Sequence, residues 1–302
     1  YVLNKRRREE FNGSETYTGY PGSPSGKGVN ASIYWTDQTS WSNENTLTYK
    51  RRFGRSHNVD LMAGLSLQGQ NYTYDGVSAT QITSEELGIA GIHTGNYQKV
   101  QSNYYDWRMM SMFLRANYNF RYKYYLTFSF RADGSSKFPT DNRWGYFPAA
   151  ALGWRIAEEP WMINTKDWLS NLKLRFSYGT AGNNRISSSM YETTYKAYGS
   201  GKYYGAGNQQ NPHYTLNNSQ LANPELKWET TITRNVGLDF GFFDERISGS
   251  LDYYWNTTKD LLLDAPVTAI GYTSMQQNIG QTSNRGVESV SYTHLRAHET
   301  RH

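Results

Sequence analysis

The feature that most constrains this chain is a regular alternation of apolar and polar residues. Between residues 171 and 179, apolar side chains occupy every second position and polar ones lie between them: Leu172, Leu174, Phe176 and Tyr178 against Lys173, Arg175 and Ser177. Successive side chains of a β-strand point to opposite faces, so this period predicts a strand with one apolar and one hydrophilic face. The pattern recurs along the chain and predicts an all-β fold.

Eight such strands are expected, near residues 45–53, 58–72, 108–120, 123–133, 144–156, 171–179, 227–240 and 246–256, with a ninth starting near Gly286. The links between them alternate in length. Short links lie at 54–57, 121–122 and 241–245, a middling one lies around 158–160, and long ones cover roughly 73–107, 180–226 and 257–285. An antiparallel meander of eight or nine strands would gather the long links at one end of the sheet.

Unequal links favour a transmembrane β-barrel, which has short turns on one side of the membrane and long loops on the other. The apolar face would contact lipid, the polar face would line the lumen, and aromatic residues such as Trp154 and Trp255 would mark the interfaces. The content of 26 Tyr, 12 Phe and 9 Trp fits this arrangement. A soluble β-sandwich with one buried face explains the alternation equally well.

Composition excludes several function classes. The lack of cysteine excludes disulfide scaffolds, Cys-ligated zinc, Fe–S clusters and thiol catalysis. A net charge of +5 is too mild to predict nucleic-acid binding, and the basic run Lys5–Arg8 is followed at once by Glu9 and Glu10. Apolar runs fall short of the roughly 18 residues that a transmembrane helix needs.

Longer motifs add a resemblance. They are RADGSSKF at 131–138, the run 142–156, NLKLRFSYGTAGN at 171–183, NPELKWE at 223–229, 235–240, and 278–280 with 284–288. Together they resemble the SusC/RagA family of TonB-dependent outer-membrane transporters, in register from about residue 40 to 288.

This resemblance implies a large plugged barrel in the outer membrane of a Gram-negative, Bacteroidetes-like bacterium. Such a barrel imports oligosaccharides or peptides, is capped outside by a SusD-like surface lipoprotein, and is powered by TonB from the periplasm. The plug and the TonB-contacting segment are not recognisable in this chain. We therefore expect an internal barrel fragment, which by itself forms an open curved sheet: 1–44 as an extracellular-loop-like segment, and 45–288 as a partial barrel domain.

Residues 289–302 depart from the family pattern, because Ser289, Ser291 and Thr293 fall on the apolar parity of Val287. The segment resembles a translated sequencing adapter, and we expect it to be non-native. His294, His298 and His302 have a spacing that would align three imidazoles on a helix, but the segment has no helix start and we predict no metal site.

Two residues conflict with the strand pattern. Arg234 falls on the apolar parity between Ile232 and Val236, which requires a bulge or a misread strand, because a lipid-facing Arg at mid-depth costs roughly 2–4 kcal/mol. Pro148 lies inside an expected strand, where it needs an edge, a bulge or a strand end.

Catalytic motifs are not recognisable. The pairs Glu9–Glu10, Glu85–Glu86 and Glu158–Glu159 point to opposite faces if extended, whereas a retaining glycosidase needs two carboxylates that converge. The run Ser25–Gly28 is too short for a phosphate loop, and His57, His93 and His213 are expected in turns or loops. We predict that the chain is not an enzyme and binds no cofactor; an all-β hydrolase is the weakest hypothesis.

Aromatic residues of the longest link are the candidates for substrate binding. They lie among Gly, Ser and Asn, next to Lys196 and Lys202: Tyr195, Tyr198, Tyr203, Tyr204 and Tyr214. Flat rings with hydroxyl groups can stack on sugars. Packing against neighbouring loops or a lid protein is the alternative. The main hypothesis is thus a barrel wall with substrate loops, and the second is a soluble all-β glycan-binding module.

Overall fold

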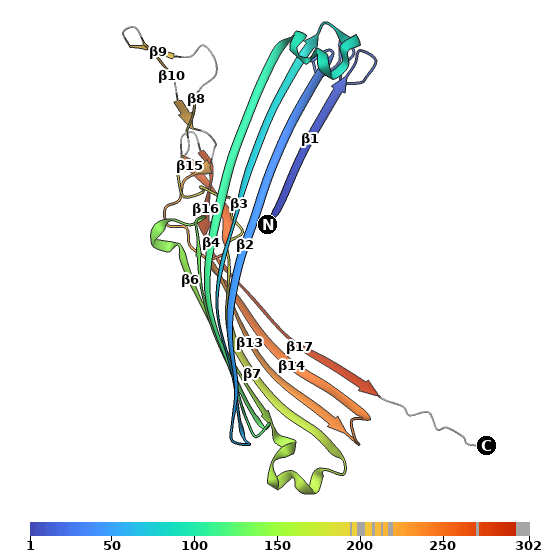
Figure 1. Ribbon diagram of the computed structural model, residues 1–302, viewed down its shortest axis with the longest axis vertical. Helices are drawn as coiled ribbons and strands as arrows, with labels where there is room; N and C mark the ends of the chain where they lie inside the picture. Colours follow the sequence, from blue (N-terminus) through green and yellow to red (C-terminus); the bar gives the residue numbers. More distant parts are fainter. Residues whose placement is uncertain are drawn as a thin grey trace, which may run out of the picture. The chain divides into compact units, whose positions relative to one another are not determined.

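The computed structural model describes residues 1–193, 195–197, 203–206, 209–212, 214–216, 220–269 and 272–293. At residues 97, 195–197, 203–206, 209–212, 214–216 and 269 only the backbone is described. The main element is a ten-stranded sheet with the order β1-β2-β3-β4-β5-β6-β7-β13-β14-β17, in which chain neighbours lie side by side (Figure 1). Its strands are β1 (Val2–Asn12), β2 (Asn30–Phe53), β3 (His57–Ile82), β4 (Gly95–Phe120), β5 (Tyr124–Ser135), β6 (Trp144–Arg155), β7 (Leu169–Asn183), β13 (Glu229–Phe242), β14 (Ile247–Lys259) and β17 (Gln281–Thr293).

Short elements fill the links. Two-stranded ladders pair β9 (Tyr203–Ala206) with β10 (Gln209–Pro212) and β8 (Tyr195–Ala197) with β11 (Tyr214–Leu216); a third small sheet contains β12 (Gln220–Leu221), β16 (Tyr272–Asn278) and β15 (Leu262–Ala269). The 3₁₀ turns are η1 (Glu85–Thr94), η2 (Thr140–Asn142), η3 (Ile156–Glu158) and η4 (Pro160–Thr165). Helices long and apolar enough to cross a membrane are absent from the described residues.

The all-β antiparallel meander is confirmed, and all nine expected strands occur, in a sheet that is open between β1 and β17. The link expected at 73–107 is wrong in extent, because β3 continues to Ile82 and β4 begins at Gly95. Residues 73–80 have no sustained apolar alternation, so this pattern does not reveal them, although Tyr, Thr and Val favour strands.

Strands also occupy both ends of the chain beyond the expected barrel domain. Residues 1–44 contain β1 and the first part of β2, which pair from Val2↔Ser40 to Asn12↔Asn30. At the other end, β17 stays paired with β14 as far as Thr293. The location of residues 1–44 outside the membrane and the origin of residues 289–302 stay predictions.

The chain divides into two compact units. Unit 1 comprises residues 1–43 and 67–109, and unit 2 comprises 44–66 and 110–302. The core of unit 1 is small: Ala31, Ala79 and Ile82 are buried, and Phe11, Val29, Ile89 and Ile92 pack against them. A carboxylate oxygen of Glu85, in η1, accepts a 2.7 Å hydrogen bond from the backbone N–H of Ser14 and holds the turn in place.

One face of the sheet in unit 2 is apolar yet exposed. Cross-strand pairing aligns Phe176 with Leu152 and Val236, and Leu238 with Leu174 and Leu251, so these side chains share a face. Phe128 is 46% exposed, Phe176 44% and Leu251 44%. A contiguous apolar surface of this kind is rare on a soluble monomer and indicates contact with lipid or protein.

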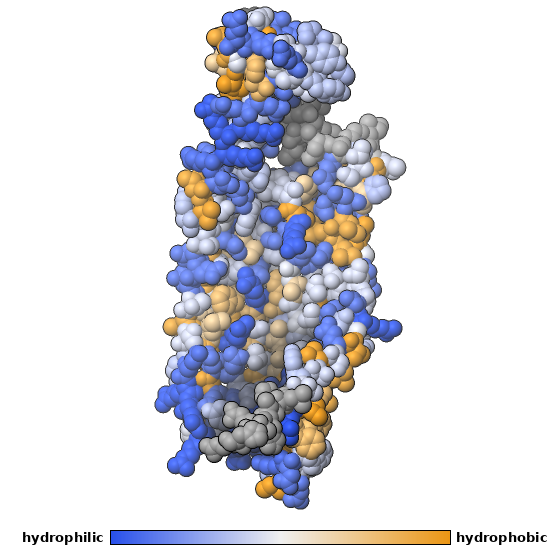
Figure 2. Space-filling view, turned by 90° about the vertical axis from the view of Figure 1, so that its right-hand side faces the viewer, coloured by the Kyte–Doolittle hydropathy of each residue, from blue (hydrophilic) through white to orange (hydrophobic). Residues whose placement is uncertain are grey.

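The opposite face of the same strands is held by charges. The Arg175 guanidinium donates to both carboxylate oxygens of Asp239, at 2.8–3.0 Å, and to Asp252 at 3.0 Å. Its arm passes over Gly237, where a Cβ would lie 2.6 Å from the guanidinium carbon. The view in Figure 2 shows a surface on which hydrophilic residues predominate and hydrophobic residues form separate patches.

Pro148 lies at the end of a strand ladder, which is one of the three positions expected for it. It lies opposite Phe130 in the ladder between β5 and β6, but the ladder between β6 and β7 begins only at Ala149. Pro148 therefore lies at the end of that second ladder, where a missing N–H is tolerated. Its carbonyl oxygen accepts a hydrogen bond from the Thr180 hydroxyl at 3.0 Å.

Candidate ligand-binding pocket

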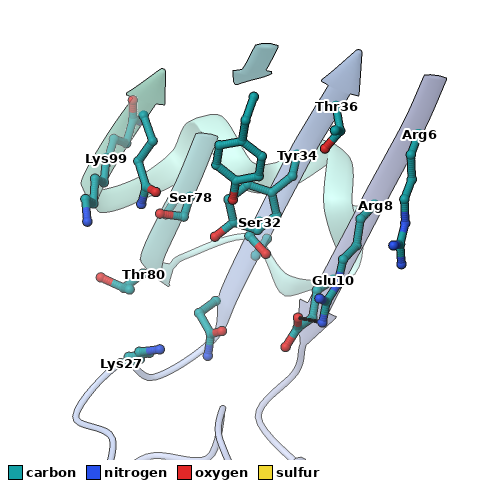
Figure 3. Close-up of a pocket in the computed structure, with 16 residues that line it drawn as sticks. Arg6, Arg8, Glu10, Lys27, Ser32, Tyr34, Thr36, Ser78, Thr80 and Lys99 are labelled. Carbon is teal, nitrogen blue, oxygen red and sulfur yellow. Dashed lines mark hydrogen bonds and ion pairs between the residues drawn. The ribbon is translucent and has the colours of Figure 1, made fainter. Parts of the chain in front are cut away.

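A polar pocket of about 770 Å³ lies in unit 1 (Figure 3). It is formed by β1, β2, β3, β4 and the segment before β2, and its lining residues are Arg6, Arg8, Glu10, Lys27, Asn30, Ala31, Ser32, Tyr34, Thr36, Tyr74, Ser78, Ala79, Thr80, Gln98, Lys99 and Gln101. Most of these side chains are hydrogen-bonding groups, and the volume is that of a small-ligand site.

Strand pairing explains how β1 contributes to the pocket. Arg6 lies opposite Thr36 and Arg8 opposite Tyr34, so these side chains share one face. Lys5 and Arg7 lie on the other face, where Lys5 pairs with Asp37 at 3.6 Å and Arg7 with Glu9. The basic run is therefore divided between two faces of the strand, and only two of its cations line the pocket.

Two tyrosine rings form an aromatic surface in the pocket. Tyr34 and Tyr74 stack with ring centroids 5.4 Å apart and planes 18° from parallel. A Cβ at Gly76 would overlap the Tyr34 ring, so glycine makes room for it. The phenol hydroxyls of Tyr34 and Tyr74 add hydrogen-bonding groups beside this stacked surface.

The charge of the lining is mainly positive. Four lining residues are basic (Arg6, Arg8, Lys27 and Lys99), and the only acidic one, Glu10, accepts a 3.3 Å hydrogen bond from Arg8. Figure 3 shows that the cations come from different segments, with Arg6 and Arg8 on β1 and Lys99 on β4. This arrangement suits an anionic group and a planar or hydroxyl-rich ligand. A single paired carboxylate offers no acid–base couple for glycoside hydrolysis.

The adjacent carboxylates Glu158 and Glu159 hold local structure. Glu158 forms an ion pair with Arg155 at 3.5 Å. Glu159 accepts hydrogen bonds from the Tyr124 hydroxyl at 2.5 Å and the Trp154 indole at 3.0 Å. The bond from Tyr124, then that from Trp154, lowers the pKa of Glu159, which lies in the link between β6 and β7. These groups tie the link to the strand ends and do not face one another.

The structure does not test the loop tyrosines predicted to bind substrate. Tyr198 lies outside the described residues, and only the backbone is described at the other four. Tyr203 pairs with Pro212 and Tyr204 with Asn211, while Tyr195 pairs with Leu216 and Tyr214 with Ala197. Their roles stay predictions.

The histidines that can be located have local partners. His57 Nδ1 shares a 2.7 Å hydrogen bond with the Tyr118 hydroxyl, and His93 Nδ1 lies 2.9 Å from the Ala90 carbonyl oxygen. His213, His294, His298 and His302 lie outside the described residues. Within the part of the chain that the structure describes, no three His, Cys, Asp or Glu residues gather as metal ligands would.

A second site, in unit 2, unites the sequence motifs; we call it the motif core (Phe138, Phe147, Leu226 and Trp228). Phe138 and Leu226 are fully buried. The Trp228 ring lies 5.1 Å from the Phe138 ring and meets Phe147 edge-on at 5.6 Å. Its indole N–H donates to the Arg143 carbonyl oxygen at 3.0 Å. A Cβ at Gly182 would overlap the Phe147 ring.

Side-chain amides join the motifs to one another. Asn142 donates to the Glu225 carbonyl oxygen at 3.1 Å, and Asn278 donates to that of Lys227 at 2.8 Å. Asn183 donates to the Glu229 carboxylate at 3.0 Å. The motifs that looked separate in the sequence thus form one connected structure at the ends of β5, β6, β7 and β13.

The comparison with known families agrees with this geometry. The family model for TonB-dependent receptor-like β-barrels matches residues 3–297. The chain belongs to this family. TonB-dependent receptor P26 of Formosa agariphila is 33% identical over 283 residues, covering 90% of the chain and 27% of the relative. SusC of Bacteroides thetaiotaomicron is 41% identical over 183 residues, or 60% of the chain and 18% of the relative.

Solved structures show the same relationship. The structure of the RagAB peptide transporter matches 98% of this chain and 32% of the transporter's own chain, with a TM-score of 0.81 and 25% identity. The RagAB peptide importer in the "open-open" state matches 96% of this chain and 30% of its own chain, with a TM-score of 0.79 and 27% identity. The resemblance to the SusC/RagA family is confirmed. The chain spans about a quarter of the length of the Formosa relatives that it matches.

Sequence reasoning missed the pocket in unit 1. In the sequence, the basic run that contains Arg6 and Arg8 is followed at once by Glu9 and Glu10, and Lys27 lies in a run that is too short for a phosphate loop. Tyr34 and Tyr74 lie in stretches without apolar alternation. The two-residue period of a strand could have revealed part of the pocket. If residues 2–12 are taken as a strand, Arg6, Arg8 and Glu10 fall on one face.

Proposed function

We propose that this chain is part of the wall of an outer-membrane TonB-dependent importer, and that the pocket in unit 1 lies on its substrate path. The observation that carries the proposal is the split between an exposed apolar face and a charged opposite face, in a chain that belongs to the TonB-dependent receptor-like barrels. Such a split suits hydrocarbon outside and water inside.

The length of the strands supports a membrane-spanning role. β13 and β14 have 14 and 13 residues, above the 9–11 that a tilted strand needs to cross a bilayer. Aromatic side chains mark both ends of the apolar region. Trp168 stacks on Phe242 at the short-link end, and Tyr178 and Trp255 lie toward the long-link end.

The pocket suggests the chemistry of the substrate. Within unit 1, the pocket residues Ser32, Tyr34 and Thr36 share one face of β2, and this face would meet the substrate. The excess of basic groups favours an oligosaccharide or peptide with a negatively charged group, and Tyr34 and Tyr74 add a stacking surface. RagAB is described as a peptide transporter, which makes an acidic peptide one of the two candidates.

The same proposal specifies partners. A SusD-like surface lipoprotein would cover the outer mouth, and TonB would act through a plug supplied by the rest of the importer. The location is the outer membrane of a Gram-negative, Bacteroidetes-like cell. The chain would transport and not catalyse, in keeping with the receptors and transporters that it matches. The soluble glycan-binding alternative is disfavoured, because its apolar face would stand in water.

Uptake by cells tests this function. Cells that express the full-length protein should take up labelled acidic oligosaccharides or peptides, and uptake should stop when the gene is deleted or a protonophore is added. The protein should fractionate with outer membranes. Recovery from the soluble fraction, or uptake that persists in the deletion strain for every labelled compound, would refute the proposal.

The loop tyrosines are tested in the same assay. The double variant Tyr203→Ala/Tyr204→Ala should take up substrate more slowly if these rings touch it. Unchanged uptake would limit the two side chains to loop packing.

A further inference from the structure

Arg234 lies on the apolar face of β13 with no break in strand register. The pairing with β7 runs without interruption from Glu229↔Asn183 to Gly241↔Asn171, and the pairing with β14 keeps one register on both sides of Arg234. Neither a bulge nor a misread strand, the two explanations offered by the sequence, therefore applies. Arg234 shares its face with Phe176, Tyr178 and Val236.

Its position along the strand explains how the membrane tolerates it. Phe242, at the short-link end, is eight residues from Arg234, which corresponds to about 27 Å along a strand. A barrel strand tilted by about 40° converts this into roughly 20 Å of depth, close to the height of a full apolar band. Arg234 is thus at the outer boundary of the band, where the cost of a lipid-facing arginine falls to about 0–1 kcal/mol.

Aromatic rings hold the guanidinium in place. The Arg234 guanidinium carbon lies 4.6 Å from the Trp255 ring centre and 6.0 Å from that of Tyr178, which are cation–π distances. Arg234 also donates one long hydrogen bond, 3.4 Å, to the Thr257 hydroxyl. Among the described residues no carboxylate pairs with Arg234, so its positive charge is positioned but not neutralised.

An apolar groove of about 430 Å³ runs along the sheet surface beside this cation. Leu152, Phe176, Val236 and Tyr253 contribute to its walls, and Arg234 is the one charged residue among those that line it. A second cation, Arg285, lies opposite Trp255 on β17 and therefore on the same face. The site thus combines an apolar channel with positive charge at its outer end.

From this geometry we infer that Arg234, Tyr178 and Trp255 form a binding site for the phosphate headgroup of an outer-leaflet lipid, whose acyl chain lies in the adjacent groove. Charge complementarity identifies the occupant: the groove fits hydrocarbon, and the unpaired guanidinium at its end fits a phosphate through charge-assisted hydrogen bonds. The inference rests on the membrane location in the proposed function. Its ligand is a lipid at the outer wall and not the imported substrate.

Lipid A is the probe for the test, because it carries phosphate headgroups and acyl chains. The full-length protein, purified in a mild detergent and freed of lipid, is titrated with bisphosphorylated lipid A and with lipid A dephosphorylated by a phosphatase. Bound lipid is counted by native mass spectrometry. Arg234→Met should weaken lipid A binding about tenfold, equivalent to about 1.4 kcal/mol, and should leave the dephosphorylated lipid unaffected.

Two further variants guard against a general effect of charge. Arg234→Lys keeps the charge but loses the planar stacking group, and should fall between wild type and Arg234→Met. Arg246→Met removes an exposed arginine from the short-link end of the same hairpin and should bind lipid A like wild type. A change in electrophoretic mobility when the sample is heated checks that each variant is folded before heating.

The inference is overturned if Arg234→Met binds lipid A as wild type does, or if wild type binds dephosphorylated lipid A equally well. Inorganic phosphate at 10 mM should not displace lipid A; displacement would assign the site to a free anion. Fractionation and uptake report the proposed function separately. A protein that imports substrate but fails the lipid test therefore refutes only this inference.

Discussion

The motif core of unit 2 and the pocket of unit 1 differ in how their side chains are used. In the motif core, Phe138 and Leu226 are fully buried and the indole of Trp228 is hydrogen-bonded to the backbone. In the pocket, Arg6, Arg8 and Lys99 are exposed, and their charged ends face solvent. The motifs that identify the family thus serve packing, whereas the groups suited to ligand binding lie outside them.

The largest expected effect is on the motif core. Trp228→Ala should destabilise the full-length barrel by about 3–5 kcal/mol, because it removes a buried ring together with its hydrogen bond to Arg143. Denaturant unfolding in detergent micelles measures this. The control is Trp35→Ala in unit 1, where the ring is 41% exposed and the loss should be much smaller. Equal losses would remove the distinction between the two regions.

A glycine pair sharpens the same comparison. Gly182→Ala should destabilise the barrel by about 1–3 kcal/mol, since the added methyl group overlaps the Phe147 ring. Gly76→Ala should displace Tyr34 in the open pocket and reduce substrate binding more than stability. Gly182→Ala should therefore lower the unfolding free energy more than uptake, and Gly76→Ala should lower uptake more than the unfolding free energy. The same proportion of losses in both variants would contradict this difference between the two regions.

The charge of the pocket gives a binding prediction. Arg6→Gln/Arg8→Gln should raise the KM for uptake of an acidic substrate about tenfold and weaken its dependence on salt, since two of the four cations are lost. The unfolding free energy should hardly change, because exposed ion pairs contribute little. Arg7→Gln, on the other face of β1, is the matched control and should leave KM unchanged.

A small pH effect is expected at the short-link end of unit 2. The native pKa of Glu159 is lowered from its ordinary value near 4.5, so its carboxylate stabilises the fold above that pH. This contribution disappears as the pH falls through the lowered native pKa. Wild type should exceed Glu159→Gln in stability by a constant amount between pH 6 and 8, and the gap should close in acid. A gap that persists at pH 2 would contradict the pKa assignment.

Much of the fold could be predicted from the sequence because lipid-facing strands carry a strong signal. Leu172, Leu174 and Phe176 alternate with charged and polar residues, and all nine strands found in this way exist. β1, residues 30–44 of β2, residues 73–82 of β3 and residues 95–107 of β4 were missed, because these stretches have no sustained apolar alternation. Periodicity in hydrophobicity cannot detect a strand that has no apolar face.

The candidate pocket was beyond sequence reasoning for a different reason. Arg8, Tyr34, Tyr74 and Lys99 come from four strands, and their convergence depends on register that sequence patterns do not reveal. Arg234 is the opposite case, because the sequence did reveal that this residue is unusual. Its conflict with strand parity was visible in the sequence, but the stacking on Trp255 that resolves it was not.

The central claim is that the two faces of the sheet in unit 2 meet different solvents. Single cysteines at Leu174 and Lys173, which are adjacent on β7, allow nitroxide labels to report each face in the full-length protein in lipid vesicles. The label at 174 should collide mainly with dissolved oxygen, which concentrates in hydrocarbon, and the label at 173 with a water-soluble nickel chelate. Equal accessibility of both labels to the chelate would contradict the account.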